Sequence, residues 1–203
     1  MFAKLISIEG PDRVGKATQS KNIVETFKGM NRSTKRIEIP FNDRLTYKMI
    51  YWMLRNGLVK KTPNLFQFVQ FFNKFLFQIV VLPWLWLRYD FIVFDRWALS
   101  AIVYGDASGA SGWFNRMLCS MLVKPYLTII LMGRARGVCD EDVYEKDTTI
   151  QKLVRVGYND YAAKNMADCC IVDCEDTVEA VHWNIIEELI FENIIPTVTA
   201  RYP

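Results

Sequence analysis

The chain contains 203 residues, of which 51% are hydrophobic and 23% are charged. This composition excludes a disordered protein and fits one globular domain over residues 1–203. The net charge of +3 provides no overall basic surface, so we expect neither a nucleic acid nor a membrane as a partner. Five cysteines without CxxC spacing, and an apolar N-terminal run too short for a signal peptide, predict a reduced cytoplasmic protein.

Strands and helices are predicted in alternation from the N-terminus to residue 81. Short apolar runs bounded by turns indicate strands, and longer runs with helical spacing of the apolar residues indicate helices. A glycine-containing turn at 10–15 separates the first strand from the first helix, and Pro40 ends the second strand. The predicted elements are strands 5–8 and 36–39 and helices 16–28, 44–58 and 65–81.

The second half of the chain continues the same alternation. The charged, glycine-flanked segment 133–146 lies between a predicted strand and a predicted helix, where a short lid is expected. Alternating strands and helices favour an α/β fold, in which helices cover both faces of a parallel sheet. The predicted elements are strands 91–94, 126–131 and 169–172 and helices 112–122, 149–164 and 177–191.

The segment 66–87 is apolar enough to be compared with a membrane span. It contains Asn73, Lys74, Gln78 and Pro83. The uninterrupted apolar run after Lys74 is shorter than the roughly 20 residues that a span requires. We therefore interpret this segment as a buried helix or as a helix that contacts a second subunit.

Residues 10–16 match the pattern GxxxxGK between a predicted strand and a predicted helix. In this motif the backbone N–H groups surround the phosphates of a nucleotide, and the lysine neutralises their oxygens. The N-terminal end of the following helix attracts the same anion. We predict that ATP is bound by Gly10, Asp12, Arg13, Val14, Gly15, Lys16, Ala17 and Thr18.

The residue after the motif lysine departs from the usual pattern. Ala17 stands where a serine or threonine hydroxyl normally coordinates Mg²⁺. Thr18 is no obvious substitute, because successive helical residues point about 100° apart. Mg²⁺ keeps much of its hydration shell, so a carboxylate and waters can hold it instead. We predict Mg²⁺ as the cofactor that accompanies ATP, and Asp95 as its ligand.

Several motifs follow one another in the order found in a known family. They are GPDRVGKATQ at 10–19, FDRW at 94–97 with Ser100 and Tyr104 after it, Lys124-Pro125, DVYE at 142–145, and Gln151. By these motifs, which extend across most of its length, the chain resembles the thymidylate kinases. The resemblance implies a P-loop NTPase fold with a five-stranded parallel sheet flanked by helices, a short lid at 133–146, and a homodimer.

The resemblance also implies the catalytic groups. Arg13, inside the loop, would contact the transferred phosphoryl group beside Lys16. Arg96, at the carboxyl end of a predicted strand, would hold the acceptor phosphate with its planar guanidinium. Arg134 and Arg136 open the lid segment. They would either add a cationic contact when the lid closes or simply solvate the loop, and both interpretations stay open.

The acceptor site differs from the family pattern at three positions. Asn42 replaces a common arginine, Lys74 replaces the usual arginine after Asn73, and Gln70 replaces a base-stacking phenylalanine. Lys74 can still meet a phosphate as a point charge. The predicted acceptor-binding residues are Asp12, Pro40, Asn42, Gln70, Lys74, Arg96, Ser100, Tyr104 and Tyr144.

We therefore predict ATP-dependent phosphorylation of a deoxynucleoside monophosphate, with the conversion of dTMP to dTDP favoured. One alternative is a kinase for another nucleoside monophosphate, or for a deoxynucleoside whose hydroxyl proton Glu9 would accept. Arg96 and Lys74 argue against a nucleoside, because they supply positive charge for a phosphate that it lacks. Another alternative is a non-enzymatic P-loop switch protein, which the missing hydroxyl at Ala17 keeps open.

Overall fold

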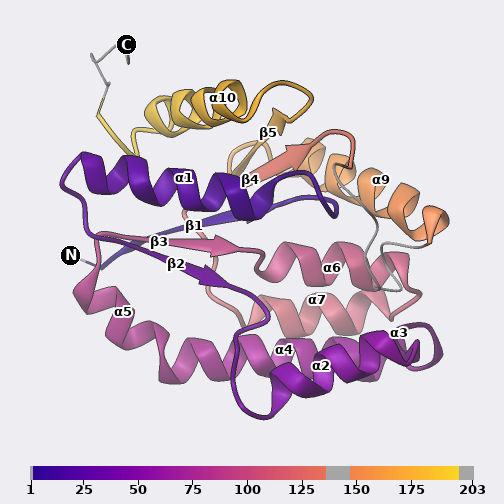
Figure 1. Ribbon diagram of the computed structural model, residues 1–203. Helices are drawn as coiled ribbons and strands as arrows, with labels where there is room; N and C mark the ends of the chain where they lie inside the picture. The colour runs from indigo at the N-terminus through magenta and orange to yellow at the C-terminus, as the bar shows by residue number, and fades with distance from the viewer. Residues whose placement is uncertain (1, 136–146, 197–203) are drawn as a thin grey trace.

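A computed structural model describes residues 2–135 and 147–196. Its five parallel strands form one sheet in the order β2-β3-β1-β4-β5 (Figure 1). Ile8 near the end of the central strand is paired with both Asp95 and Ile129, so the carboxyl ends of three strands meet at one edge of the sheet. The strands are β1 Lys4–Glu9, β2 Thr34–Glu38, β3 Phe91–Asp95, β4 Leu127–Met132 and β5 Cys169–Asp173.

Helices cover both faces of the sheet, as Figure 1 shows. Helices α1 and α10 pack together on one face, and α4, α6, α7 and α9 lie on the other. Strands β1 and β3 are almost entirely buried, as expected for a parallel sheet covered on both sides. The helices are α1 Lys16–Gly29, α2 Thr46–Arg55, α3 Leu58–Lys61, α4 Pro63–Val80, α5 Leu82–Arg88, α6 Ala98–Ala107, α7 Gly112–Ser120, α9 Thr148–Lys164 and α10 Val178–Phe191.

These elements confirm the predicted α/β fold with its five-stranded parallel sheet, but helices α3, α5 and α6 were not predicted and the helix predicted at 44–58 has other bounds. The helix predicted at 44–58 begins only at Thr46, because the carboxylate of Asp43 accepts the N–H groups of Thr46 and its neighbours and fixes the start there. It ends at Arg55, before Gly57 with φ 65°. Helix α6 was not predicted at all. Its buried residues surround most of the helix, so it lacks a clear apolar stripe.

The apolar segment 66–87 forms two helices. Helices α4 and α5 meet at a bend of 47°. No single helix among the described residues is long and apolar enough to cross a membrane, although these two pass by length and composition when taken together. Phe66 and Phe71 of α4 are buried in the core, whereas Phe68 and Phe72 are exposed and stack on each other with ring centroids 6.4 Å apart.

Candidate active site

The glycine motif forms a tight loop between β1 and α1. Gly10 has φ 138° and Gly15 has φ 94°, which are conformations that side chains with a Cβ rarely adopt. A Cβ on Gly10 would also collide with the carbonyl oxygen of Leu131 on the neighbouring strand. Arg13 has φ 61° despite its side chain. The two glycines therefore shape the loop, and Gly15 leads directly into the N-terminus of α1.

The side chain of Lys16 is buried beneath this loop. It is only 6% exposed and donates a hydrogen bond to the carbonyl oxygen of Pro11. Burial, with the nearby Arg96 charge, lowers the pKa of Lys16 to about 7. A pocket above the loop, hereafter the loop pocket, is lined by Arg13, Val14, Gly15, Lys16, Ala17, Thr18, Gln19, Glu38, Asp95, Arg96, Cys174, Val178 and Val181.

Arg96 follows β3 and reaches back to the loop. Its backbone N–H donates to the carbonyl of Ile8 at 3.0 Å, in a conformation with φ 69°. Its guanidinium forms an ion pair with Asp12 and donates to the carbonyl of Gly10 at 3.2 Å. Gln151 of α9 donates to the other carboxylate oxygen of Asp12 at 2.9 Å. Arg96 is therefore held at the end of the sheet in one defined orientation.

Asp12 remains ionised in this setting. Burial by itself would raise the pKa of its carboxyl group, but the charges of Arg96 and Lys16 outweigh burial and lower it. Arg96 also lies over the ring of Tyr104, with 5.2 Å between the guanidinium carbon and the ring centroid. The guanidinium of Arg96 is thus fixed between the carboxylate of Asp12 and the ring of Tyr104.

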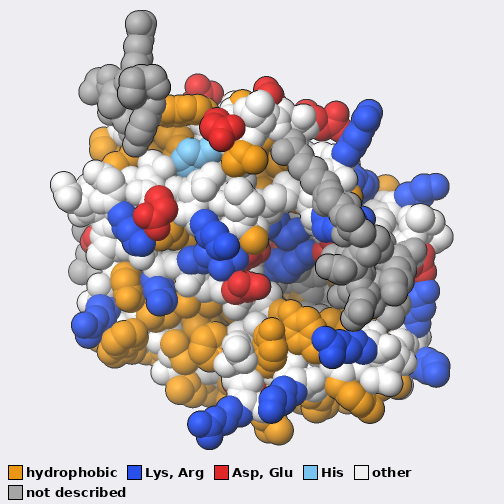
Figure 2. All heavy atoms as spheres, viewed as in Figure 1, with side chains coloured by type: hydrophobic (Ala, Val, Ile, Leu, Met, Phe, Trp, Pro, Cys, Tyr) orange, Lys and Arg blue, Asp and Glu red, His pale blue; other side chains and the backbone are white. Residues whose placement is uncertain are grey.

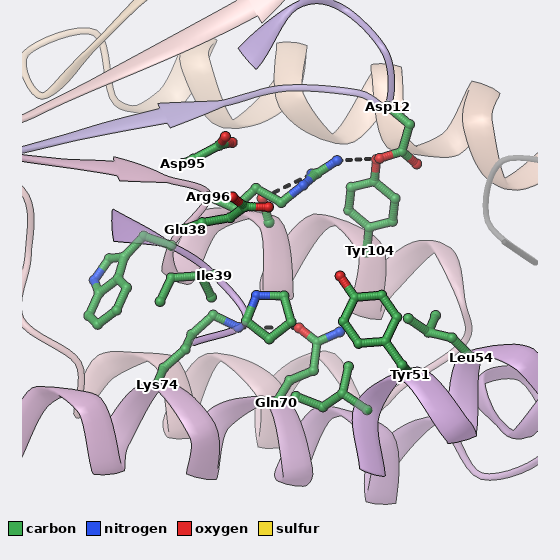
Figure 3. Close-up of a pocket in the computed structure, with 14 residues that line it drawn as sticks. Asp12, Glu38, Ile39, Tyr51, Leu54, Gln70, Lys74, Asp95, Arg96 and Tyr104 are labelled. Carbon is green, nitrogen blue, oxygen red and sulfur yellow. Dashed lines mark hydrogen bonds and ion pairs between the residues drawn. The ribbon is translucent and has the colours of Figure 1, made fainter. Parts of the chain in front are cut away.

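A second pocket, hereafter the helix pocket, lies between the sheet edge and helices α2, α4 and α6 (Figure 3). Its polar end holds Asp12, Asp95 and Arg96, and its other end is formed by side chains of α2 and α4. The complete lining is Asp12, Glu38, Ile39, Pro40, Ile50, Tyr51, Leu54, Gln70, Lys74, Asp95, Arg96, Trp97, Ser100 and Tyr104.

The loop pocket and the helix pocket share three residues: Glu38, Asp95 and Arg96. Figure 2 shows basic side chains gathered around a hollow on this face of the molecule. Arg36 of β2 forms ion pairs with both shared carboxylates, with Asp95 and, at 3.2 Å, with Glu38. Two anionic ligands bound in the two pockets would therefore meet at Glu38, Asp95 and Arg96, hereafter the wall.

Lys74 and Gln70 stand one helical turn apart on α4 and point into the helix pocket (Figure 3). The Lys74 side chain donates to Oε1 of Gln70 at 3.2 Å. Burial lowers the pKa of Lys74 to about 8. The helix pocket thus contains a buried amine and an amide whose oxygen faces that amine.

A buried network supports the wall from behind. Glu9 is fully buried and accepts hydrogen bonds from the Trp97 N–H at 2.7 Å and from the Ser100 hydroxyl. Burial raises the pKa of Glu9. Tyr158 also hydrogen-bonds to Ser100, at 3.1 Å. Glu9 lines neither the loop pocket nor the helix pocket, and its two hydrogen bonds hold the start of α6 in place.

The structure brings most of the predicted acceptor residues together. Asn42 is the exception: it is exposed and absent from both pocket linings. The chain turns there because Asn73 exchanges two hydrogen bonds of 2.8 Å with the backbone of Phe41 and contacts Asp43. The predicted residues that line the helix pocket are Asp12, Pro40, Gln70, Lys74, Arg96, Ser100 and Tyr104.

The predicted lid is described only at its first residues. Arg134 is 90% exposed and its guanidinium lies 3.5 Å from the carboxylate of Glu175. Arg136 and Tyr144 lie outside the described residues. Sequence reasoning missed six residues of the helix pocket: Glu38, Ile39, Ile50, Tyr51, Leu54 and Trp97. The spacing of Ile50 and Leu54 on one face of α2 was the available signal for that helix.

The donor groups near the loop suit a hydrated Mg²⁺ ion. Within residues 2–135 and 147–196 no cluster of three acidic, histidine or cysteine side chains could hold a metal by itself. Glu38 and Asp95 nevertheless both line the loop pocket. Mg²⁺ is usually bound by one or two carboxylates together with substrate phosphates and waters, and these two carboxylates fit that requirement.

Comparison with known proteins agrees with this geometry. The chain is 29% identical to a thymidylate kinase of Plasmodium falciparum over 199 residues, covering 92% of this chain and 89% of that protein. The fold is similar to thymidylate kinase structures from Candida albicans (TM-score 0.79, 23% identity, 95% and 93% of the two chains) and Ehrlichia chaffeensis (TM-score 0.75, 20% identity, 93% and 100%). The thymidylate kinase family model matches residues 8–185. The chain therefore belongs to the thymidylate kinase family of nucleoside monophosphate kinases, which use ATP to phosphorylate dTMP to dTDP.

Proposed function

We propose that ATP binds in the loop pocket, that dTMP binds in the helix pocket, and that the phosphoryl group passes directly between them. The observation that carries this assignment is the wall of Glu38, Asp95 and Arg96 that both pockets share. Direct transfer requires the attacking and leaving oxygens to lie roughly in line with the phosphorus atom. The shared residues place the two pockets next to each other, so donor and acceptor phosphates bound in them would approach one another.

The cationic residues of the two pockets then have separate roles in binding and catalysis. Lys16 and the loop N–H groups hold the donor phosphates, and Arg13 stabilises the charge that spreads over the transferred group. Arg96 exchanges its ion pair with Asp12 for the phosphate of the acceptor, with Lys74 as a second cation. Catalysis in this scheme comes from positioning and charge neutralisation.

The same contacts disfavour a nucleoside as the acceptor. A nucleoside kinase needs a carboxylate that can take up the hydroxyl proton. Glu9 is buried behind the wall and already accepts two hydrogen bonds. Arg96 and Lys74 would meanwhile face no phosphate. A monophosphate acceptor resolves both points, because its own ionised oxygen attacks.

Asp95 and Glu38 are the residues that would hold Mg²⁺. When bound, the ion would neutralise charge on the phosphates of ATP, which is its general role in phosphoryl transfer. Arg36 pairs with both carboxylates. We propose that this pairing fixes the position of the carboxylates, which would hold the ion without help from a hydroxyl at residue 17.

A homodimer is the assembly we propose. Large apolar side chains are exposed on three neighbouring helices: Trp52 on α2, Phe68 and Phe72 on α4, and Trp113 and Met117 on α7. Figure 2 shows hydrophobic side chains on the lower part of one face, where Figure 1 places α2 and α4. Exposed apolar side chains on neighbouring helices support an interface, because apolar surface left exposed on a protein often marks one. A cytoplasmic location and a single domain remain predictions.

Measuring ADP formation tests the proposed reaction. The protein is incubated with ATP and Mg²⁺ and with dTMP, dUMP, dCMP, dGMP, dAMP or thymidine in turn. We expect turnover with dTMP and none above background with thymidine. Arg96→Lys keeps the charge but loses the planar fork, and should raise KM for dTMP more than KM for ATP. Phosphorylation of thymidine in preference to dTMP would refute the assignment of the helix pocket. Sedimentation of the free protein tests the dimer, which a monomer at micromolar concentration would contradict.

A further inference from the structure

Gln70 can in principle read either kind of hydrogen-bonding group on a base. Its amide carries an oxygen that accepts and a nitrogen that donates. Which of the two faces the helix pocket therefore decides what the residue selects. In the structure this orientation is set by a neighbouring side chain rather than by Gln70 itself.

Lys74 fixes the amide. A lysine ammonium group can only donate hydrogen bonds, so the group at 3.2 Å from it has to be the oxygen Oε1. Lys74 is 2% exposed and sits one turn further along α4. The nitrogen of Gln70 consequently lies on the side away from Lys74, toward Tyr51 (Figure 3). Its N–H donors face the part of the helix pocket that α2 closes.

Few polar side chains on this side could compensate for a mismatched base. Of the side chains that α2 contributes to the lining, Ile50 and Leu54 carry no polar atoms and Tyr51 carries one hydroxyl. A base amino group placed against the Gln70 N–H donors would leave donors facing donors in a partly buried site. An unmatched polar group of this kind lowers affinity far more than an apolar wall does.

We propose that Gln70, oriented by Lys74, selects an acceptor base that presents a carbonyl oxygen and rejects one that presents an amino group at the same position. In pyrimidines this is position 4, so thymine and uracil are accepted and cytosine is rejected. The inference rests on the proposed function only in assigning the monophosphate to the helix pocket. It gives the position where an aromatic residue is usual in the family a hydrogen-bonding role.

The matched substrates dUMP and dCMP test the proposal. They differ at position 4 and in the proton on the adjacent ring nitrogen. A third compound, the 2-pyrimidinone deoxyriboside monophosphate, keeps the bare nitrogen of cytosine but has no group at position 4. For each compound we would measure kcat/KM and, by calorimetry without ATP, the dissociation constant. We expect dUMP to be preferred over dCMP by at least about tenfold in both measurements, with the pyrimidinone between them.

Four variants distinguish hydrogen bonding between Gln70 and the base from simple packing of the side chain against the base. Gln70→Glu offers only acceptors and should lower the dUMP to dCMP ratio by at least about tenfold, while Gln70→Met should bring the ratio toward one. Lys74→Met should lower the ratio because the amide can then turn, whereas Lys74→Arg keeps an obligate donor and should preserve it. Since each ratio is taken within one variant, losses common to all substrates cancel.

Ile79→Leu, on the exposed side of α4, is the matched control and should leave the ratio unchanged. A wild-type ratio near one, an unchanged ratio in Gln70→Glu, or a pyrimidinone bound as well as dUMP would each overturn the inference. If no monophosphate were phosphorylated but calorimetry still gave the expected ratios, the proposed reaction would fail while the role of Gln70 would stand.

Discussion

Proton uptake on nucleotide binding provides a quantitative test of the loop. Burial lowers the pKa of Lys16 to about 7 in the free protein. With that pKa the amine is about 90% neutral at pH 8, about half neutral at pH 7 and about 10% neutral at pH 6. Bound phosphates favour the charged form and should return the pKa toward the ordinary value for lysine. Binding should therefore take up about 0.9 proton at pH 8 and about 0.1 proton at pH 6.

The direction of the effect follows from the sign of the shift. A depressed pKa in the free protein means that protons are missing above pH 7 and are regained when the anion arrives. Uptake must therefore grow as the pH rises from 6 to 8. Burial lowers the pKa of His182 below the ordinary 6.5, and His182 lines neither pocket, so nucleotide binding should leave its protonation unchanged.

Calorimetry with ADP and Mg²⁺ in two buffers of different ionisation enthalpy measures the uptake directly. A nucleotide that is fully ionised at pH 8 contributes no proton of its own. The control is Lys16→Met, whose uptake should vanish while weaker binding remains measurable at higher protein concentration. Uptake below about 0.3 proton at pH 8, uptake that persists in Lys16→Met, or uptake that grows toward pH 6 would refute the reasoning.

Three further substitutions test separate parts of the molecule. Arg13→Ala should lower kcat on the order of 10³-fold with the fold intact; a near-normal kcat with saturating substrates would transfer its role to a lid arginine. Ala17→Ser should be tolerated and should lower the Mg²⁺ concentration needed for tight ATP binding, measured by titration; a steep loss of activity would contradict the placement of the ion. Gln67 is 1% exposed, and neither atom of its amide has a hydrogen-bond partner among the described residues, so Gln67→Met should stabilise the protein by about 1–2 kcal/mol in urea unfolding. Destabilisation would show that a bridging water satisfies the amide.

Local sequence signals were sufficient for the loop and for the alternation of elements. Gly10, Gly15 and Lys16 occupy positions that backbone geometry and phosphate chemistry require, and they fall between an apolar strand and a helix. The FDRW motif likewise indicated that Arg96 follows a strand, and β3 ends at Asp95. Such features depend on neighbours within a few residues, which is why the sequence displays them.

The helices around the helix pocket were harder to predict. Helix α6 is buried on most sides, so its apolar residues do not mark one face. The start of α2 depends on Asp43, whose position in turn depends on Asn73 of α4. Interactions between segments thirty residues apart leave no periodic trace. The same reason explains why Asn42, a predicted acceptor-binding residue, is exposed and lies outside both pocket linings.

The sequence by itself determined the nucleotide loop, the strand and helix alternation, and the family motifs, because each is encoded in residues close together along the chain. Only the tertiary structure decided that Glu38, Asp95 and Arg96 form one wall between two pockets, that Arg36 holds both of its carboxylates, and that Lys74 turns the amide of Gln70. These arrangements depend on the strand order, which brings β2, β3 and β1 side by side from distant parts of the chain, and on the electrostatic preferences of the groups that this order brings together.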